Sequence, residues 1–303
     1  MEYIITCNTA GDTLSKISLD DYSVENLPLE LGEKPVGPHG VDYYNGNIIT
    51  ANNYSNSISI FSLLENRELN NIYVGAHPND VKVYKGKAYV ICGESDSLVI
   101  IDLNKRSMIF EIYLGAGSFP HNIEIYHEKA IAYVSNMESH SVSVIDCLNN
   151  KIIKNIKSPE YPTKILLSKD KKKLYLCESY QGMDIDGYIS VISTESNEVI
   201  KRIKVGGTPV DVFEEDERLY ITDFAEGYLS IIDLNKGREV KKIFVGGMPR
   251  GIIKYKEDIF IGNNMTGKVT KLNLKERIIK NITVGKEPNA MILVDYPQRI
   301  IDL

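Results

Sequence analysis

Two similar stretches decide the fold of this chain. Residues 205–213 read VGGTPVDVF, and residues 245–253 read VGGMPRGII. Both contain a Gly-Gly-x-Pro turn followed by a short apolar run, and related turns recur along the whole sequence. The prolines of these turns, called anchor prolines below, are at positions 38, 78, 120, 162, 209, 249 and 288. A pattern repeated at intervals of about 40 residues is typical of a repeat architecture.

An apolar residue follows each anchor proline by three positions. These residues are Val41, Val81, Ile123, Ile165, Val212, Ile252 and Met291. Glycine precedes most of the prolines, as in residues 74–78, VGAHP. In the first unit two prolines fit the pattern, because Pro35 follows the better glycine turn whereas Pro38 keeps the spacing to Val41.

Between the anchor prolines the apolar residues alternate with a period of two, which predicts strands rather than helices. After Pro120 come residues 123–126, 130–135, 141–146 and 151–156, four short runs separated by polar turns. Runs of this kind, rich in β-branched residues, are typical of strands. Four strands in each unit predict the blades of a β-propeller, because a single four-stranded sheet needs neighbours to cover both its faces.

The two ends of the chain complete the last unit. One clear strand, residues 291–295, follows Pro288, while residues 3–6, 13–18 and about 24–29 match the second, third and fourth strands of other units. We therefore predict one all-β domain over residues 1–303. It is a seven-bladed β-propeller of four-stranded antiparallel blades, with the last blade closed by one C-terminal strand and three N-terminal strands.

Composition excludes several classes of function. Lys and Arg number 35 against 41 Asp and Glu, so the net charge is -6, and we expect neither nucleic acid nor a membrane as a partner. No segment reaches the ~18 apolar residues of a membrane helix. The N-terminal residues lack a secretory signal pattern. The cysteines Cys7, Cys92, Cys147 and Cys177 are not closely paired, as is typical of cytosolic thiols. We expect a cytoplasmic monomer.

Short motifs resemble a known family. Residues 133–136 (YVSN), followed by residues 142–146 (VSVID), resemble the YVTN repeat, as do residues 175–178 (YLCE) and 220–223 (YITD). The Gly-His and Trp-Asp marks of the related WD40 repeats are missing. The resemblance implies a seven-bladed propeller of the YVTN and lactonase-like group. That group includes binding proteins, surface proteins and a few enzymes, so the fold alone does not specify an activity.

The propeller resemblance also implies where a site lies. The first strand of each blade lines a central channel, so residues after the anchor prolines and at the ends of the second strands should meet around one mouth. The post-proline pairs are His39-Gly40, Asn79-Asp80, His121-Asn122, Thr163-Lys164, Val210-Asp211, Arg250-Gly251 and Asn289-Ala290. A water-filled channel and a ligand site both explain polar residues at these positions.

The first functional hypothesis is a non-enzymatic protein that binds a small polar molecule or a protein at the mouth. The candidate ligand-binding residues are Asn79, Asp80, Asn122, Lys164, Asp211, Asp223, Arg250 and Asn289. Lys164 and Arg250 could clamp an anion between them. Alternatively, Lys164, Asp211 and Arg250 could form an ion-pair network between blades.

The second hypothesis is a lactonase-like hydrolase or lyase. Its candidate acid-base groups are His39, His121, Glu94 and Glu178, because histidine changes charge most readily near neutral pH. His39, His121 and Glu94 are also the candidate ligands of a divalent metal ion, the one cofactor that these residues suggest. No phosphate loop, nucleophile elbow or Cys-x-x-Cys motif is present.

One unit carries an insertion. The interval from Pro162 to Pro209 is longer than the others because of residues 178–187, which we expect to cover part of the mouth. We expect His77 and His140 to lie on surface loops.

Overall fold

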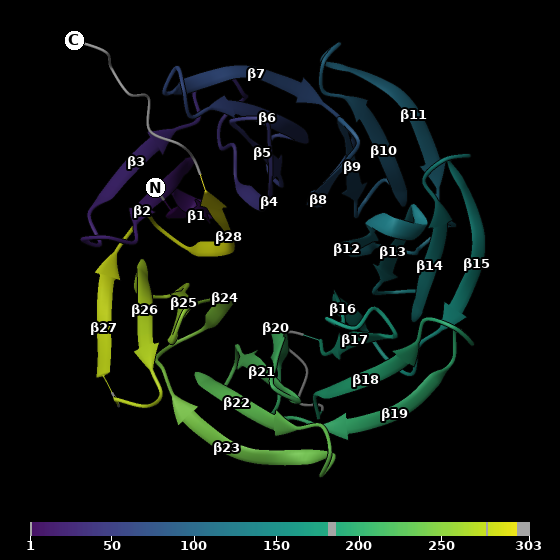
Figure 1. The fold of residues 1–303 in the computed structure, drawn as a ribbon. Helices are drawn as coiled ribbons and strands as arrows, with labels where there is room; N and C mark the ends of the chain where they lie inside the picture. Colours follow the sequence, from purple (N-terminus) through teal and green to yellow (C-terminus); the bar gives the residue numbers. More distant parts are fainter. Residues whose placement is uncertain (1, 181–185, 277, 296–303) are drawn as a thin grey trace.

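The computed structural model describes residues 2–180, 186–276 and 278–295. Within these residues the chain forms seven four-stranded antiparallel sheets, arranged as blades around a central axis (Figure 1). The predicted seven-bladed propeller is therefore confirmed. The same residues contain no helix that is long and apolar enough to cross a bilayer.

Each innermost strand begins at an anchor proline, where the missing N–H of proline is tolerated at the first residue of a strand. These strands are β4 (Pro38–Tyr44), β8 (Pro78–Tyr84), β12 (Pro120–Tyr126), β16 (Pro162–Leu167), β20 (Pro209–Glu215), β24 (Pro249–Tyr255) and β28 (Pro288–Asp295). Each blade is named below by its innermost strand. The first unit begins at Pro38 rather than Pro35, so the spacing and not the glycine turn identifies the anchor.

In six blades the other strands follow in chain order toward the outer edge, and in the last blade β28 is followed by β1, β2 and β3. The second strands are β1 (Glu2–Asn8), β5 (Asn47–Asn52), β9 (Lys87–Cys92), β13 (Ile131–Asn136), β17 (Lys173–Glu178), β21 (Arg218–Asp223) and β25 (Asp258–Asn263). The third strands are β2 (Thr13–Ser18), β6 (Ser57–Ser62), β10 (Ser97–Asp102), β14 (Ser141–Asp146), β18 (Tyr188–Ser193), β22 (Tyr228–Asp233) and β26 (Lys268–Asn273). The outermost strands are β3 (Val24–Pro28), β7 (Arg67–Tyr73), β11 (Ser107–Tyr113), β15 (Lys151–Lys157), β19 (Val199–Lys204), β23 (Arg238–Phe244) and β27 (Ile278–Thr283). The short 3-10 helices η1 (Thr9–Gly11) and η2 (His127–Lys129) lie in turns.

Apolar side chains pack between neighbouring blades. The seven residues that follow the anchor prolines by three positions are all buried, as the repeat predicts. One cluster joins Tyr89 and Leu98 of the β8 blade to Ile123 and Val134 of the β12 blade. Each sheet thus buries its faces against its two neighbours, which only a closed ring can provide for every blade.

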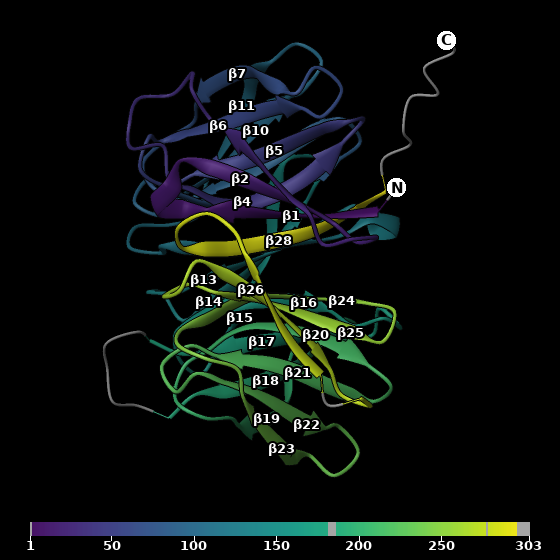
Figure 2. The ribbon, with the colours of Figure 1, turned by 90° about the vertical axis from the view of Figure 1, so that its left-hand side faces the viewer.

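Pairing between β1 and β28 closes the ring (Figure 2). Residues 2–6 of β1 pair antiparallel with residues 291–295 of β28. Ile4, Ile5 and Val294 are fully or almost fully buried in this blade. The first and last strands of the described chain therefore lie in one sheet, as predicted.

Removal of β28 should destabilise the whole propeller. A chain that ends at residue 287 leaves β1 without its inner partner and exposes the faces of two neighbouring blades. We expect its melting temperature in calorimetry to fall by more than about 10 °C. A chain that ends at Asp295 keeps every described strand and is the control. An unchanged melting temperature in the shorter chain would refute the closure.

Candidate functional site

A bulge follows the anchor proline in each described blade. The register between the innermost strand and the second strand shifts directly after the proline in all seven sheets. Bulges change the direction of the side chains beside them. The residues one and two positions after the proline thereby reach the channel, while the next apolar residue remains buried between blades.

A cavity of about 350 Å³ occupies the mouth of the channel, within the usual size range of small-molecule sites. All seven blades contribute to its wall. The sequence-predicted residues that line it are His39, Asn79, Asp80, His121, Asn122, Lys164, Asp211, Arg250 and Asn289. The structure therefore brings together most of the candidate residues from separate repeats.

Two candidate acid-base groups lie outside this cavity. The side chain of Glu94 is 63% exposed, and its Oε1 lies 3.8 Å from Nδ1 of His77. Glu178 is buried and accepts a hydrogen bond from Nε of Arg202 at 2.8 Å. Burial raises the pKa of Glu178, and its partner Arg202 favours the charged form. Glu178 is therefore a structural ion-pair residue of the β16 blade.

Asp223 also lies outside the cavity. Its carboxylate accepts hydrogen bonds from the backbone N–H groups of Gly207 and Thr208, at 3.0 and 3.2 Å. At the matching position of the β4 blade, Asn52 donates to Ser57 and Ser59. The last residue of the second strand thus holds nearby turns and strands in these blades, which explains its polarity without a ligand.

The metal hypothesis gains no geometric support. The described part of the chain contains no group of three or more His, Cys, Asp and Glu side chains that could hold a metal ion. Glu94, the proposed third ligand beside His39 and His121, faces His77 instead. The four cysteines are buried and unbridged, and burial raises the pKa of all four thiols, so they behave as small apolar residues.

His39 and His121 have a defined tautomer. Nδ1 of His39 lies 2.8 Å from the carbonyl oxygen of Asn79, and Nδ1 of His121 lies 3.3 Å from that of Thr163. A carbonyl oxygen can only accept, so each Nδ1 donates a proton to the next blade and each Nε2 is an acceptor. Burial, and next the positive charge of Arg250, lower the pKa of His39 to about 3 and that of His121 to about 4. Both rings are therefore neutral near pH 7.

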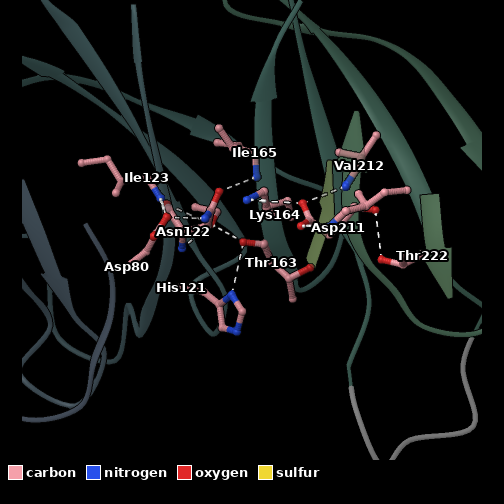
Figure 3. A network of polar contacts seen from close by, with 12 residues as sticks. Asp80, His121, Asn122, Ile123, Thr163, Lys164, Ile165, Asp211, Val212 and Thr222 are labelled. Carbon is pink, nitrogen blue, oxygen red and sulfur yellow. Dashed lines mark hydrogen bonds and ion pairs between the residues drawn. The ribbon is translucent and has the colours of Figure 1, made fainter. Parts of the chain in front are cut away.

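Polar side chains close to His121 connect consecutive blades (Figure 3). Asp80 accepts hydrogen bonds from the side-chain amide of Asn122 and, at 3.3 Å, from the backbone N–H of Ile123. The side-chain oxygen of Asn122 accepts from the backbone N–H of Ile165 at 2.9 Å. Each of these side chains comes two residues after an anchor proline and ties its blade to the next one.

Lys164 and Asp211 continue this chain as an ion pair, and they are two members of the network with Arg250 that one of the two sequence interpretations proposed. Nζ of Lys164 lies 3.3 Å from Oδ1 of Asp211, whose other oxygen accepts from the backbone N–H of Ile252 at 3.1 Å. Both side chains also line a second cavity of about 560 Å³, further along the innermost strands. The pair thus borders both the mouth cavity and this second cavity. The guanidinium of Arg250 lies over the ring of Phe224, 4.6 Å from its centre.

The remaining blades carry a small residue at the same position. A Cβ added to Gly251 would lie 2.1 Å from the carbonyl oxygen of Asn289, and one added to Gly40 would lie 2.5 Å from Cα of Asp80. Contacts this short require the backbone to move. Glycine at these two positions therefore permits the close approach of neighbouring blades.

Substitution of Gly251 by alanine should destabilise the propeller, because the new methyl group meets the backbone of the next blade. We expect a loss of about 2 kcal/mol or more in the free energy of unfolding, measured with urea. Gly207→Ala is the matched control, since the nearest atom to its added Cβ is 3.6 Å away. Equal stability of the Gly251 variant and the control would show that this contact is relieved without cost.

The neutral histidines predict a pH dependence of stability. Their pKa values are near 6.5 in the unfolded chain and about 3 and about 4 in the folded one. Above about pH 6.5 neither state binds the protons, and no stability is lost. As the pH falls from about 6.5 toward about 4, the unfolded chain takes up protons that the folded one excludes. Each histidine then costs up to about 1.4 kcal/mol per pH unit.

Urea midpoints of the wild type and of the His39→Gln, His121→Gln double variant, measured from about pH 7.5 to about pH 4.5, test this dependence. The wild type should lose stability faster than the variant below about pH 6.5. Parallel curves for the two proteins would contradict the assignment.

Sequence reasoning missed part of the wall. His77, expected on a surface loop, lines the cavity together with Phe119, Met137 and Tyr180. His77 and Phe119 directly precede anchor prolines, so the repeat itself marks their position. Within the insertion that we expected to cover the mouth, Tyr180 lines the cavity. Residues 181–185 of the insertion lie outside the described residues.

No family model and no curated protein match the chain. Solved structures share its fold. A putative 6-phosphogluconolactonase from Bacteroides fragilis is 12% identical with a TM-score of 0.78, covering 97% of this chain and 98% of that one. Virginiamycin B lyase from Staphylococcus aureus is 17% identical with a TM-score of 0.71, and the match covers 84% of this chain and 87% of that one. Hydrazine synthase from Kuenenia stuttgartiensis is 17% identical with a TM-score of 0.77, and the match covers 86% of this chain and 91% of that one. These similarities show the propeller fold and specify no activity.

Proposed function

We propose that the protein is a non-enzymatic binding protein that takes a small polar molecule into the mouth cavity. We also propose that it belongs to the YVTN and lactonase-like propellers, whose motifs its repeats resemble. The proposal depends mainly on one observation: Nδ1 of His39 and Nδ1 of His121 each face a backbone carbonyl oxygen, which leaves each Nε2 as a hydrogen-bond acceptor.

The two histidines are suited to recognition rather than to proton transfer. A general acid or base is most effective when its pKa lies near the working pH. With pKa values of about 3 and about 4, His39 and His121 are weak bases and have no acidic proton on Nε2 at neutral pH. Fixed neutral acceptors of this kind select ligands that carry N–H or O–H groups.

The charged groups of the wall support the same function. Lys164 is paired with Asp211, and Asp80 is hydrogen bonded to Asn122. These contacts fix the wall before a ligand enters, so that less conformational entropy is lost on binding. Neither Glu94 nor Glu178, which the sequence suggested as acid-base partners of the histidines, lines the cavity.

Ligand-observed NMR with a library of small polar molecules tests the proposal. Compounds with N–H or O–H donors should bind the wild type, and replacing both histidines by phenylalanine should weaken binding by about tenfold, since each Nε2 acceptor is lost. His127→Phe, on η2 and exposed, is the control and should bind as the wild type does.

Two results would contradict the proposal. The first is the absence of any binding that depends on His39 and His121. The second is turnover: if the wild type opens members of a panel of lactones and the double variant does not, the protein is an enzyme of the lactonase-like kind.

A further inference from the structure

We infer that the ligand of the mouth carries an aromatic ring, which stacks against His77, Phe119 and Tyr180. These three residues are called the aromatic rim below. The inference rests on the proposed binding function and adds a chemical class, namely a small aromatic molecule with N–H or O–H donors.

Aromatic side chains occupy one side of the cavity. The three residues of the aromatic rim come from the consecutive β8, β12 and β16 blades and all line the cavity. Across the axis lie the β24 and β28 blades, which contribute Arg250 and Asn289 (Figure 1). One ligand can therefore place a ring against the rim and its polar groups against the opposite wall.

The turns before the anchor prolines hold bulky rings in an unfavourable backbone conformation. The φ angles of His77, Phe119 and Tyr161 are 58°, 45° and 27°. Positive φ is uncommon outside glycine. The matching residues of the other blades are Gly37, Thr208, Met248 and Glu287. Gly37, Met248 and Glu287 also have positive φ, so the turn does not require a ring, and its geometry does not explain aromatic residues in three consecutive blades.

Local contacts fix Phe119 in place. The carboxylate of Asp96 accepts hydrogen bonds from the backbone N–H groups of Gly117 and Phe119, at 2.7 and 2.8 Å. The ring lies close to Gly93, where an added Cβ would be 3.3 Å from Cζ of Phe119. The ring of His77 packs beside it, with centroids 5.7 Å apart. A ring held in this way can bind a ligand with little loss of its own freedom.

Tyr180 is supported by a second set of rings. Its centroid lies 4.6 Å from that of Tyr161, at an interplanar angle of 62°. Tyr161 packs edge-on against His140 at 4.6 Å, and its backbone N–H donates to Nδ1 of His140 at 2.9 Å. Edge-to-face pairs are a favoured aromatic geometry. Phe119 and Tyr180 of the aromatic rim therefore both have supporting contacts.

The size of the cavity agrees with a ring-bearing ligand. An engineered apolar cavity of about 150 Å³ can bind benzene, and the mouth cavity has about 350 Å³. It has room for one substituted ring or two fused rings. Met137, which also lines the cavity, supplies a sulfur that contacts aromatic rings favourably.

Pairs of probes that differ only in aromaticity test the inference. The pairs are para-hydroxybenzoate with its saturated-ring analogue, and benzamide with cyclohexanecarboxamide. Both members of a pair carry the same polar groups, so the ratio of their dissociation constants reports on ring stacking. In NMR titrations we expect the aromatic member to bind about threefold to tenfold more tightly.

Variants of the rim locate the effect. In Phe119→Leu and Tyr180→Leu the ratio should fall toward one, whereas Phe119→Tyr, which keeps a ring, should retain the preference. Tyr113→Leu, on the exposed strand β11, is the control and should leave the ratio unchanged.

Equal affinities within each pair, or a ratio that the rim variants do not change, would overturn the inference and leave the binding function standing. Failure of all four probes to bind the wild type would overturn the inference and also count against the proposed function.

Discussion

The contact between neighbouring blades is the interaction on which the rest of the structure depends. A four-stranded sheet cannot bury both of its faces alone, so the apolar residue three positions after each anchor proline packs between blades. The closed ring of blades brings seven innermost strands to one axis. There, polar backbone and side-chain groups must find hydrogen-bond partners. Asp80, Asn122 and Asp211 meet this need by accepting hydrogen bonds from the next blade. The wall of the mouth cavity is thus also part of the interface between blades.

The sequence predicted the fold because the features that build a blade recur at fixed spacing. The anchor prolines, the apolar residue after each of them and the alternating runs are enough to count the blades and to pair β28 with β1. The post-proline candidates also reach the cavity, because the bulge is part of the repeat. The roles of the polar residues at the ends of the second strands were harder to predict. Glu178 is bound to Arg202, and Asp223 is bound to nearby backbone N–H groups. Such local partners leave no periodic signal.

Charge is largely balanced within the site. Lys164 neutralises Asp211, and the positive charge of Arg250 helps to keep His39 and His121 unprotonated. What the wall offers a ligand is therefore a set of oriented hydrogen-bonding groups beside aromatic rings. The structural neighbours include a putative lactonase and a lyase, so the shared fold alone does not specify what such a site does.

The central claim is that His39 and His121 act as neutral acceptors, and histidine ring NMR tests it most directly. Two-bond proton–nitrogen correlation spectra, recorded from about pH 8 to about pH 5, distinguish the two neutral tautomers from the protonated ring. The account predicts that both rings keep the proton on Nδ1, leave Nε2 unprotonated and do not titrate over this range. Titration of either ring near pH 6.5, or a proton on Nε2, would contradict it.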